Sequence, residues 1–256
     1  MLIDMHVHTS RYSDCGKSSP EEMVACAEQV GLQALVFTEH HIRWPQDQLN
    51  ALQARFPRVL LMSGVEVETL EGEDLLIYGV HKEGVLYQHM PTATAIRLTH
   101  DRGGFVTLAH PYRYVDHVTA ELEWEHVDGV EVMSIHILNY ARTQAQALCQ
   151  NWQVLPMAAS DAHHVSALGL YALRLAQPIR DEFELITALR LRAFQLYSNT
   201  ERLLKSNMQV RASLDEARKG IADGLDDTAI ANRLPGFTAH MVHSIRCNLD
   251  FYRPLE

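Results

Sequence analysis

The sequence contains no apolar run that approaches the ~20 residues required by a membrane-spanning helix. Its first residues reach ionisable side chains at once, at Asp4 and His6, so a basic stretch followed by a long apolar export segment is missing as well. From these absences we expect a protein that is not inserted in a membrane and that resides in the cytoplasm.

Cysteine is scarce, and positive charge is in deficit. The 256 residues include four cysteines, Cys15, Cys26, Cys149 and Cys247, without a C-x-x-C pair, which indicates reduced thiols and no disulfide framework. The formal net charge of −10 disfavours sequence-independent nucleic-acid binding, because such binding depends on Lys and Arg at the phosphates. A small phosphorylated substrate remains compatible, since bound divalent metals can make a pocket attractive to anions.

Short β-prone apolar runs alternate with helical patterns through about residue 198. The expected strands are 2–7, 34–37, 59–62, 75–80, 106–109, 130–133 and 155–159. The expected helices are one that begins at Pro20 after the capping residue Ser19 and ends at Gly31, then 46–54, 92–101, 140–151 and 181–192. This alternation predicts an α/β fold with a parallel sheet, open or closed into a barrel, and Glu71-Gly72-Glu73 is expected to form a hairpin turn.

The pattern changes after Asn199. Residues 201–256 predict three helices, about 201–223, 227–233 and 238–252, so we expect one domain over 1–198 and a helical extension over 199–256. With Pro235-Gly236 as its turn, the extension has the rhythm of a helix-turn-helix, but its eight basic and eight acidic residues give no net positive patch, and the last helix offers only Arg246 and Arg253 plus two histidines. We therefore favour a structural cap, or a surface that forms a homo-oligomer, over DNA binding.

Polar residues gather at the carboxyl ends of the expected strands, where α/β proteins place their sites. His6 and His8 are two apart on one strand, so their side chains leave the same face and can share an ion. The candidate metal-binding residues that follow along the chain are Asp14, His40, Glu66, His110, Asp161 and His163. Imidazole and carboxylate together suit Zn, Mn or Fe, and eight ligands are more than one ion takes, which predicts more than one ion.

Each residue of this set also has an ordinary structural interpretation. A single histidine is more often a surface or hydrogen-bonded residue than a ligand, and Asp14 can be a turn aspartate. The full set favours a metal site, because chance would otherwise have to place a costly polar group at the end of five separate strands.

These motifs together resemble one known family. The segments His6-Val7-His8, Ser13-Asp14-Cys15-Gly16, Thr38-Glu39-His40, Gly64-Val65-Glu66, Ala109-His110-Pro111 and Ser160-Asp161-Ala162-His163 resemble, in order, the motifs of the PHP (polymerase and histidinol phosphatase) superfamily. The resemblance covers about residues 1–198, and it is specific only as a set.

The resemblance implies a distorted (β/α)7 barrel with a trinuclear metal centre. It implies that His6, His8, Glu66 and Asp161 hold one ion, that Glu66 bridges to a second ion with His110, and that Asp14, His40 and His163 hold the third. The chain departs from the family where a histidine is common before the strand that ends at Ile77-Tyr78-Gly79, because Asp74 stands there. Asp74 can ligate through oxygen or be an ordinary turn residue.

The implied chemistry is attack on phosphorus by a metal-bridging hydroxide. Arg113 can bind the phosphate or form a surface salt bridge. His41 and His164 each follow a proposed ligand and can protonate the leaving oxygen or face solvent. Glu131 can orient a ligating histidine or lie on the surface.

The leading hypothesis is therefore a metal-dependent phosphoesterase that uses two or three divalent ions to hydrolyse a small phosphomonoester, such as a histidinol phosphate-like compound or a nucleotide. Phosphodiester or exonuclease chemistry and C–N hydrolysis in the amidohydrolase manner are the enzymatic alternatives. A regulator that senses a metabolite and carries the helix-turn-helix-like tail is the alternative from a different class.

Overall fold

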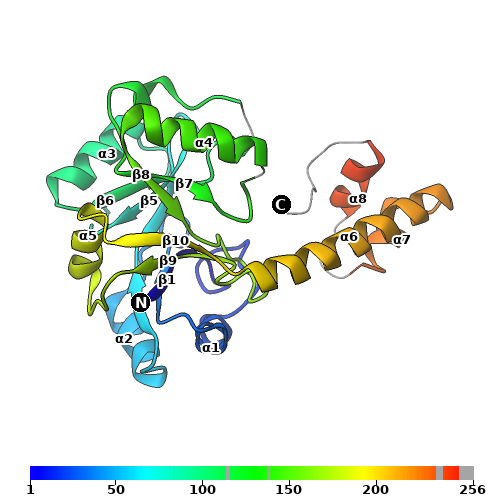
Figure 1. The fold of residues 1–256 in the computed structure, drawn as a ribbon, viewed down its shortest axis with the longest axis horizontal. Coiled ribbons are helices and arrows are strands. Elements are labelled where there is room, and N and C mark those ends of the chain that lie inside the picture. The colour runs from blue at the N-terminus through cyan, green and yellow to red at the C-terminus, as the bar shows by residue number, and fades with distance from the viewer. Residues whose placement is uncertain (83, 114–115, 138, 235–238, 248–256) are drawn as a thin grey trace. The chain divides into compact units, whose positions relative to one another are not determined.

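The computed structural model describes residues 1–82, 84–113, 116–137, 139–234 and 239–247 (Figure 1). The chain forms two compact units, Met1–Asn199 and Thr200–Glu256. No helix within these described ranges is long and apolar enough to cross a membrane.

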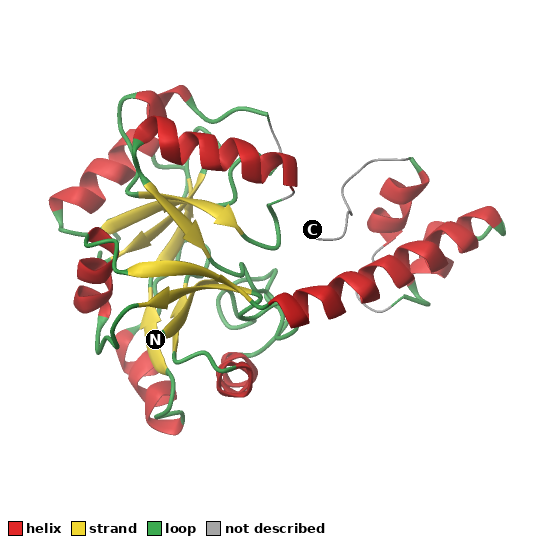
Figure 2. Ribbon diagram, viewed as in Figure 1, coloured by secondary structure: helices red, strands yellow, loops and turns green. Residues whose placement is uncertain are grey.

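The first unit is a mixed α/β fold with two five-stranded sheets (Figure 2). One sheet has the order β10-β9-β1-β2-β3, with β1 Leu2–Val7, β2 Ala34–Phe37, β3 Leu60–Ser63, β9 Tyr171–Leu175 and β10 Phe194–Ser198. The other has the order β4-β5-β6-β7-β8, with β4 Val65–Glu68, β5 Asp74–Tyr78, β6 Phe105–Leu108, β7 Gly129–Met133 and β8 Leu155–Ala158.

The parallel pairing expected from the alternation is present in part of each sheet. Strands β1, β2 and β3 are parallel, as are β6, β7 and β8. The expected hairpin is confirmed, because β4 and β5 pair antiparallel and Thr69 N donates to Glu73 O. Strands β9 and β10 were not expected, and they pair antiparallel at the edge beside β1.

Three connections link the segments of the two sheets. Only Gly64 separates β3 from β4, and a Cβ at this position would lie 2.8 Å from Ile77 O, so the close approach of the backbones requires glycine. A parallel bridge joins Val7 of β1 to Ala162, which follows β8, and another joins His40, which follows β2, to Glu66 of β4. The carboxyl ends of β1, β2 and β8 and the start of β4 are thereby brought together, and closure into a (β/α)7 barrel stays a prediction.

Helices lie around the outside of these strands (Figure 2). They are α1 Pro20–Val30, α2 Gln46–Arg55, α3 Thr92–Asp101, α4 Asn139–Trp152 and α5 Glu182–Arg190. The first begins with the expected capping box of Ser19 and Glu22 and ends at Gly31, whose φ of 81° suits a residue without Cβ. Buried faces of the helices pack with the sheets into two apolar clusters that hold the strand ends in place.

The second unit is helical, as expected. It contains α6 Thr200–Ala222, α7 Asp227–Ala231 and α8 Ala239–Arg246, around a small core of Ala217, Ile230, Leu234 and Val242. The turn proposed at Pro235-Gly236 and the residues Tyr252 and Arg253 lie outside the described residues. Arg246 donates to Asp227 Oδ1 at 2.8 Å, so this cation is paired within its own unit, which does not favour the DNA-binding alternative.

Candidate metal centre

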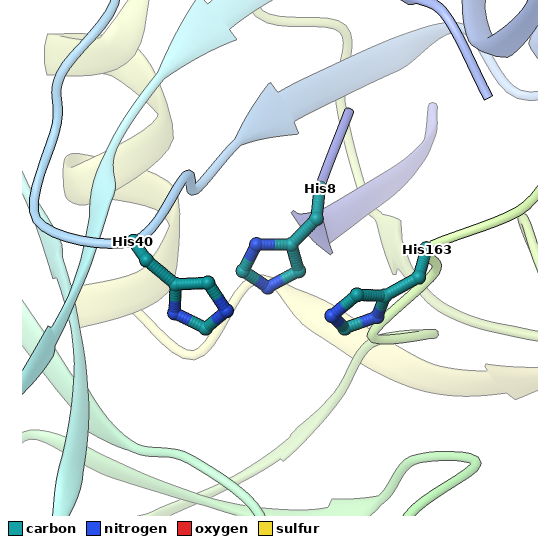
Figure 3. A group of neighbouring side chains, drawn as sticks. All are labelled: His8, His40 and His163. Atoms are coloured by element: carbon teal, nitrogen blue, oxygen red, sulfur yellow. The ribbon is translucent and has the colours of Figure 1, made fainter. Parts of the chain in front are cut away.

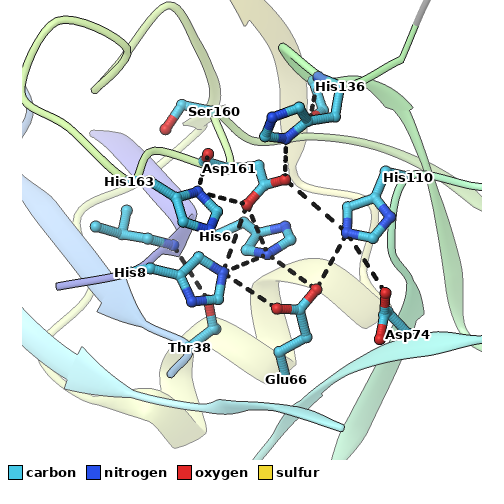
Figure 4. Close-up of polar contacts among 12 residues, drawn as sticks. His6, His8, Thr38, Glu66, Asp74, His110, His136, Ser160, Asp161 and His163 are labelled. Carbon is cyan, nitrogen blue, oxygen red and sulfur yellow. Dashed lines mark hydrogen bonds and ion pairs between the residues drawn. The ribbon is translucent and has the colours of Figure 1, made fainter. Parts of the chain in front are cut away.

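Strand β1 places two histidines at the centre of the site. His6 and His8 share one face of the strand, both side chains are fully buried, and their Nε2 atoms lie 3.0 Å apart. This distance fits a hydrogen bond between the two rings, and it also fits two nitrogens bound to one ion. The carboxylates of Glu66 and Asp161 lie beside these nitrogens (Figure 4).

Glu66, on β4, reaches four imidazole rings. Its Oε1 lies 3.4 Å from His6 Nε2 and 3.1 Å from His110 Nε2. Its Oε2 lies 3.1 Å from His8 Nε2 and 2.9 Å from His40 Nδ1. One carboxylate therefore faces ligand atoms from four different segments, which is the arrangement that a bridging metal ligand has.

Asp161, after β8, closes the other side of the cluster. Its Oδ1 lies 3.2 Å from His6 Nε2 and 3.4 Å from His8 Nε2, and 3.5 Å from His163 Nδ1. The backbone of Asp161 has a φ of 53° and that of His110 a φ of 24°, both uncommon for residues with a Cβ. The fold thus holds two of the expected ligands in strained conformations that aim them inward.

Four groups of side chains place their ligand atoms within 4.8 Å of one another. Figure 3 shows one of them, in which three imidazoles from separate segments converge. The groups are His8, His40 and His163; His6, His110 and Asp161; His6, His8 and Glu66; and Glu66, Asp74 and His110. Eight of the nine expected ligands belong to these groups, and the overlaps fit a site for several metal ions.

Two buried carboxylate oxygens bear on the interpretation of this cluster as a metal site. Glu66 Oε2 and Asp161 Oδ1 have no hydrogen-bond partner, although imidazole nitrogens lie within ion-pair distance of both. A buried carboxylate oxygen without a hydrogen bond is costly. Two ligands that each lie about 2.0–2.2 Å from one ion are themselves roughly 3–3.5 Å apart, so the spacings in this cluster fit metal coordination.

The charges of the cluster shift its pKa values in opposite directions. Burial lowers the pKa of His6, but the negative charges of Asp161, Glu131 and Glu66 outweigh it and raise the pKa well above 6.5. Burial raises the pKa of Glu66, but the nearby His6 and His8 overcome this and hold it well below 4.5. Without metal, protons on the imidazoles balance the carboxylates, and metal binding has to release them.

Buried partners hold the proposed ligands in orientation. Glu131 Oε1 lies 3.0 Å from His6 Nδ1, and Glu131 Oε2 accepts a bond of 2.9 Å from His110 N. Ser13 Oγ lies 3.2 Å from His8 Nδ1 and donates to the buried Glu39 Oε2 at 2.6 Å. Each imidazole nitrogen that faces away from the cluster in His6 and His8 is therefore fixed by a second polar group.

The remaining predicted site residues occupy different places. Arg113 Nη1 lies 3.7 Å from Asp161 Oδ2 at the rim of the cluster, with its side chain 26% exposed. The His41 ring lies 6.1 Å from the His40 ring, and its Nδ1 is buried without a hydrogen-bond partner. Asp14 and His164 are exposed, and His164 Nδ1 lies 2.9 Å from Ser166 Oγ, so the structure does not bring these two side chains into the cluster.

Asp74 lies at the margin of the cluster, beside His110. Its Oδ2 lies 3.9 Å from His110 Nε2. Burial, followed by the negative charge of Glu66, raises its pKa to about 6. Asp74 is therefore placed where it can contribute an oxygen ligand beside His110, in the position where the family commonly has a histidine.

Two further residues lie at the site although the sequence did not place them among the predicted ligands. His136 Nδ1 makes a short contact with Asp161 Oδ2, and its only sequence signal is that it follows the end of β7 by three residues. Cys15 is half-buried in the turn after β1; burial raises the pKa of its thiol, but the nearby His163 and His40 lower it to about 6. Cys15 stands next to the expected ligand Asp14, and only the course of the turn decides which of the two faces the cluster.

Two family models match the chain. The PHP domain model matches residues 4–148. The chain belongs to the PHP domain family. The model of the PHP-associated region matches residues 139–194, so the matches extend through most of the first unit. Membership of the PHP domain family and the buried groups of His, Asp and Glu together identify a metal-dependent hydrolase.

Solved structures share the fold at low identity. A protein from Bifidobacterium adolescentis described as "a putative metal-dependent phosphoesterase" is 17% identical with a TM-score of 0.52, over 63% of this chain and 87% of that one. An amidohydrolase from Chromobacterium violaceum with bound sulfate is 15% identical with a TM-score of 0.55, over 78% and 99%. A lesion-specific endonuclease from Pyrococcus furiosus is 14% identical with a TM-score of 0.53, over 76% and 57%.

These similarities support the fold and leave the substrate open, because the three neighbours are described with three different activities. No curated protein matches the chain.

Proposed function

We propose that this chain hydrolyses a small phosphomonoester, with two or three divalent ions of Zn, Mn or Fe held by the cluster. The observation that carries the proposal is Arg113, a part-exposed guanidinium 3.7 Å from the Asp161 carboxylate at the rim of the ligand groups. Guanidinium matches the geometry of phosphate oxygens and stays charged at any physiological pH. Its place beside the ligands lets one phosphoryl group meet both the cluster and Arg113.

Different residues would hold the ions, orient the phosphate and keep the ligands in place. His6, His8, Glu66 and Asp161 would hold one ion, Glu66 and His110 with Asp74 a second, and His40 and His163 a third. Ions of this kind supply an acidified water and neutralise charge on phosphoryl oxygens. Arg113 would orient the phosphate, and the buried Glu131 would keep His6 and His110 in place.

His41 and His164 remain the proposed donors of a proton to the leaving oxygen. His41 lies against His40 with an unpartnered Nδ1, whereas His164 is exposed and bonded to Ser166. The structure therefore favours His41 of the two. We also propose that the two sheets form the distorted (β/α)7 barrel of the family, since the bridges Val7–Ala162 and His40–Glu66 connect them.

The experiment is metal removal by a chelator, followed by separate reloading with Zn, Mn and Fe. Each form is assayed on an aryl phosphate, phosphorylated metabolites that include histidinol phosphate and nucleotides, a phosphodiester, a duplex with an abasic lesion, and an amide panel. We expect phosphate release from monoesters that returns with metal. Metal-restored turnover only on the diester, the duplex or the amides would replace this proposal with the corresponding alternative.

Substitutions test whether the activity depends on the proposed metal ligands. We expect His8→Ala and Asp161→Ala to abolish the metal-restored turnover while the circular dichroism of the fold is retained. The matched control is His117→Ala, because His117 is an exposed histidine paired only with Asp116 in the contacts described. Full activity in His8→Ala and Asp161→Ala would place the reaction elsewhere.

A further inference from the structure

Glu39 is a fully buried glutamate that follows β2 and that the four groups of proposed metal ligands do not include. Its Oε1 accepts from Thr9 Oγ1 at 2.5 Å and from Trp44 Nε1 at 3.0 Å. Its Oε2 accepts from Ser13 Oγ at 2.6 Å and from Thr9 N at 3.0 Å. The groups Thr9 N and Trp44 Nε1 can only donate, one to each oxygen, so both oxygens of Glu39 act as acceptors.

The donors around Glu39 leave its charge without a counter-charge. All four groups that donate to it in the described part of the chain are neutral. A buried charge without a counter-charge is costly. One of the donors, Ser13, also contacts His8 and His40, so a cation held by these histidines would compensate the charge of Glu39 across a single hydroxyl group.

The hydroxyl of Ser13 uses its full hydrogen-bonding capacity, which is one proton and two lone pairs. The proton is donated to Glu39 Oε2. The oxygen can therefore only accept from its other two neighbours, His40 N at 3.3 Å and His8 Nδ1 at 3.2 Å. His8 Nδ1 must then carry a hydrogen, which leaves Nε2 as the ring nitrogen that can offer a lone pair to an ion.

The nitrogen selected in this way faces the proposed metal ligands. His8 Nε2 lies 3.1 Å from Glu66 Oε2 and 3.4 Å from Asp161 Oδ1. These are the two buried carboxylate oxygens without a hydrogen-bond partner. The direction of the hydrogen bonds and the direction of the ring therefore agree on the same atom.

We propose that Glu39 and Ser13 are positioning residues that keep the ring hydrogen of His8 on Nδ1, so that Nε2 is the atom that binds the metal ion. Neither residue would touch the ion, and Glu39 acts through Ser13. A ring with its hydrogen on Nε2 would turn a donor toward the ion and could not bind it. The proposal rests on the metal-dependent function proposed above but not on its substrate.

The position of the ring hydrogen is measured by nuclear magnetic resonance on the full chain. The chain is labelled with ¹⁵N at histidine, stripped with a chelator and loaded with zinc. We expect a hydrogen on His8 Nδ1, assigned by its cross-peaks to the Ser13 side chain, and slow exchange of this hydrogen with water because both residues are buried. A zinc-loaded chain with the hydrogen on His8 Nε2 would overturn the proposal and leave the metal centre standing.

Zinc affinity tests the role of Ser13. Ser13→Ala removes the acceptor for His8 Nδ1, so it should weaken zinc binding by roughly 10–100-fold. The matched control is Ser63→Ala, because Ser63 is an equally buried serine whose Oγ contacts Trp44 N and Gly64 O, both at 3.0 Å. Ser63→Ala should keep the native affinity. Native affinity in Ser13→Ala, or an equal loss in Ser63→Ala, would overturn the proposal.

A double-substitution cycle tests whether Glu39 acts through Ser13. An amide can donate from one end, and in the orientation that donates to Ser13 it turns the Ser13 proton toward His8. Glu39→Gln should therefore weaken zinc binding in the native background and cause no further loss in Ser13→Ala. Equal losses in both backgrounds, or no loss in either, would show that Glu39 does not act through Ser13. A native chain that binds no zinc would overturn the metal centre as well.

Discussion

Glu131 on β7 orients two proposed ligands with one carboxylate. Its side chain is fully buried, Oε1 contacts His6 Nδ1, and Oε2 accepts from His110 N. The contact with His6 fixes which ring nitrogen faces Glu66 and Asp161, and the bond to His110 N supports a backbone with positive φ. A single residue therefore couples a strand in one sheet to a strand end in the other.

We predict that Glu131→Gln weakens zinc binding by roughly 10–100-fold, because the amide has one oxygen for two donors. Its NH₂ group would face either His6 Nδ1 or His110 N. Zinc affinity measured by competition with a chelating dye checks this. Glu125→Gln is the control, since Glu125 pairs with Arg97 at 3.2 Å. Native affinity in Glu131→Gln would show that the rings are oriented by other contacts.

His100 in α3 and Asp128 form a hydrogen-bonded pair. His100 Nε2 lies 3.0 Å from Asp128 Oδ2, and this hydrogen bond raises the pKa of His100 above 6.5. A raised folded-state pKa stabilises the fold fully below the unfolded pKa of 6.5, and the stabilisation is lost as pH rises through the folded pKa. Because His100 is 36% exposed, solvent screens the pair, and we expect about 0.5 kcal/mol.

The measurement is urea denaturation of the native chain and of His100→Gln at several pH values. The native chain should be the more stable one below the ordinary histidine pKa, and the difference should shrink as pH rises. His117→Gln is the control, because it removes an exposed histidine elsewhere. A difference between the native chain and His100→Gln that grew with pH would refute the assignment.

At the scale of elements, local patterns predict β1 and α3 but not β9 and β10. Strand β1 and helix α3 begin and end where the apolar periodicity predicts, at Leu2–Val7 and Thr92–Asp101. Strands β9 and β10 are held by long-range antiparallel pairing, such as Leu2 with Arg174 and Phe194 with Leu175. No local pattern specifies such partners, so β9 and β10 could not be predicted.

In the metal site, too, some residues could be predicted from the sequence and others could not. His8, Glu66 and Asp161 follow the carboxyl ends of β1, β3 and β8, and their convergence could be predicted because such ends form the site of an α/β fold. The positions of site residues in loops could not be predicted, because the course of a short turn decides which side chain points toward the cluster. Cys15 beside Asp14 and His136 beyond β7 are the two cases.

The turn that carries Cys15 depends on Gly16. A Cβ at this position would lie 2.3 Å from both the C and the O of Thr9, and 2.7 Å from Ser10 N. These are backbone atoms that cannot rotate away. We predict that Gly16→Ala lowers the free energy of unfolding by about 1–3 kcal/mol through overpacking, as measured by urea denaturation.

The same substitution should move the turn away from His163. Lys17→Ala is the control, because Lys17 is exposed and its bond to His163 O comes from the backbone. Native stability in Gly16→Ala would mean that the turn relaxes without cost and that residue 16 does not fix its course.

At the scale of the whole molecule, each unit has a hydrophobic core of its own. The two clusters around the sheets consist of residues between Leu2 and Tyr197, and the third consists of residues between Ala217 and Ile245. All proposed metal ligands belong to Met1–Asn199. Among the residues that the structure describes, neither the cores of the first unit nor its ligand groups include one from Thr200 onward.

We therefore predict that a chain ending at Asn199 folds cooperatively and binds zinc like the full chain, because it keeps both sheets and every proposed ligand. Thermal denaturation and zinc titration of the two chains check this. The contrasting control is a chain that ends at Arg192 and therefore lacks β10. Since β10 pairs with β9 over five residues, its removal exposes the edge of β9. This shorter chain should unfold at a lower temperature or aggregate. If the chain ending at Asn199 failed to fold as well, the helical unit would be required for the first unit to fold, and the proposed domain boundary would be wrong.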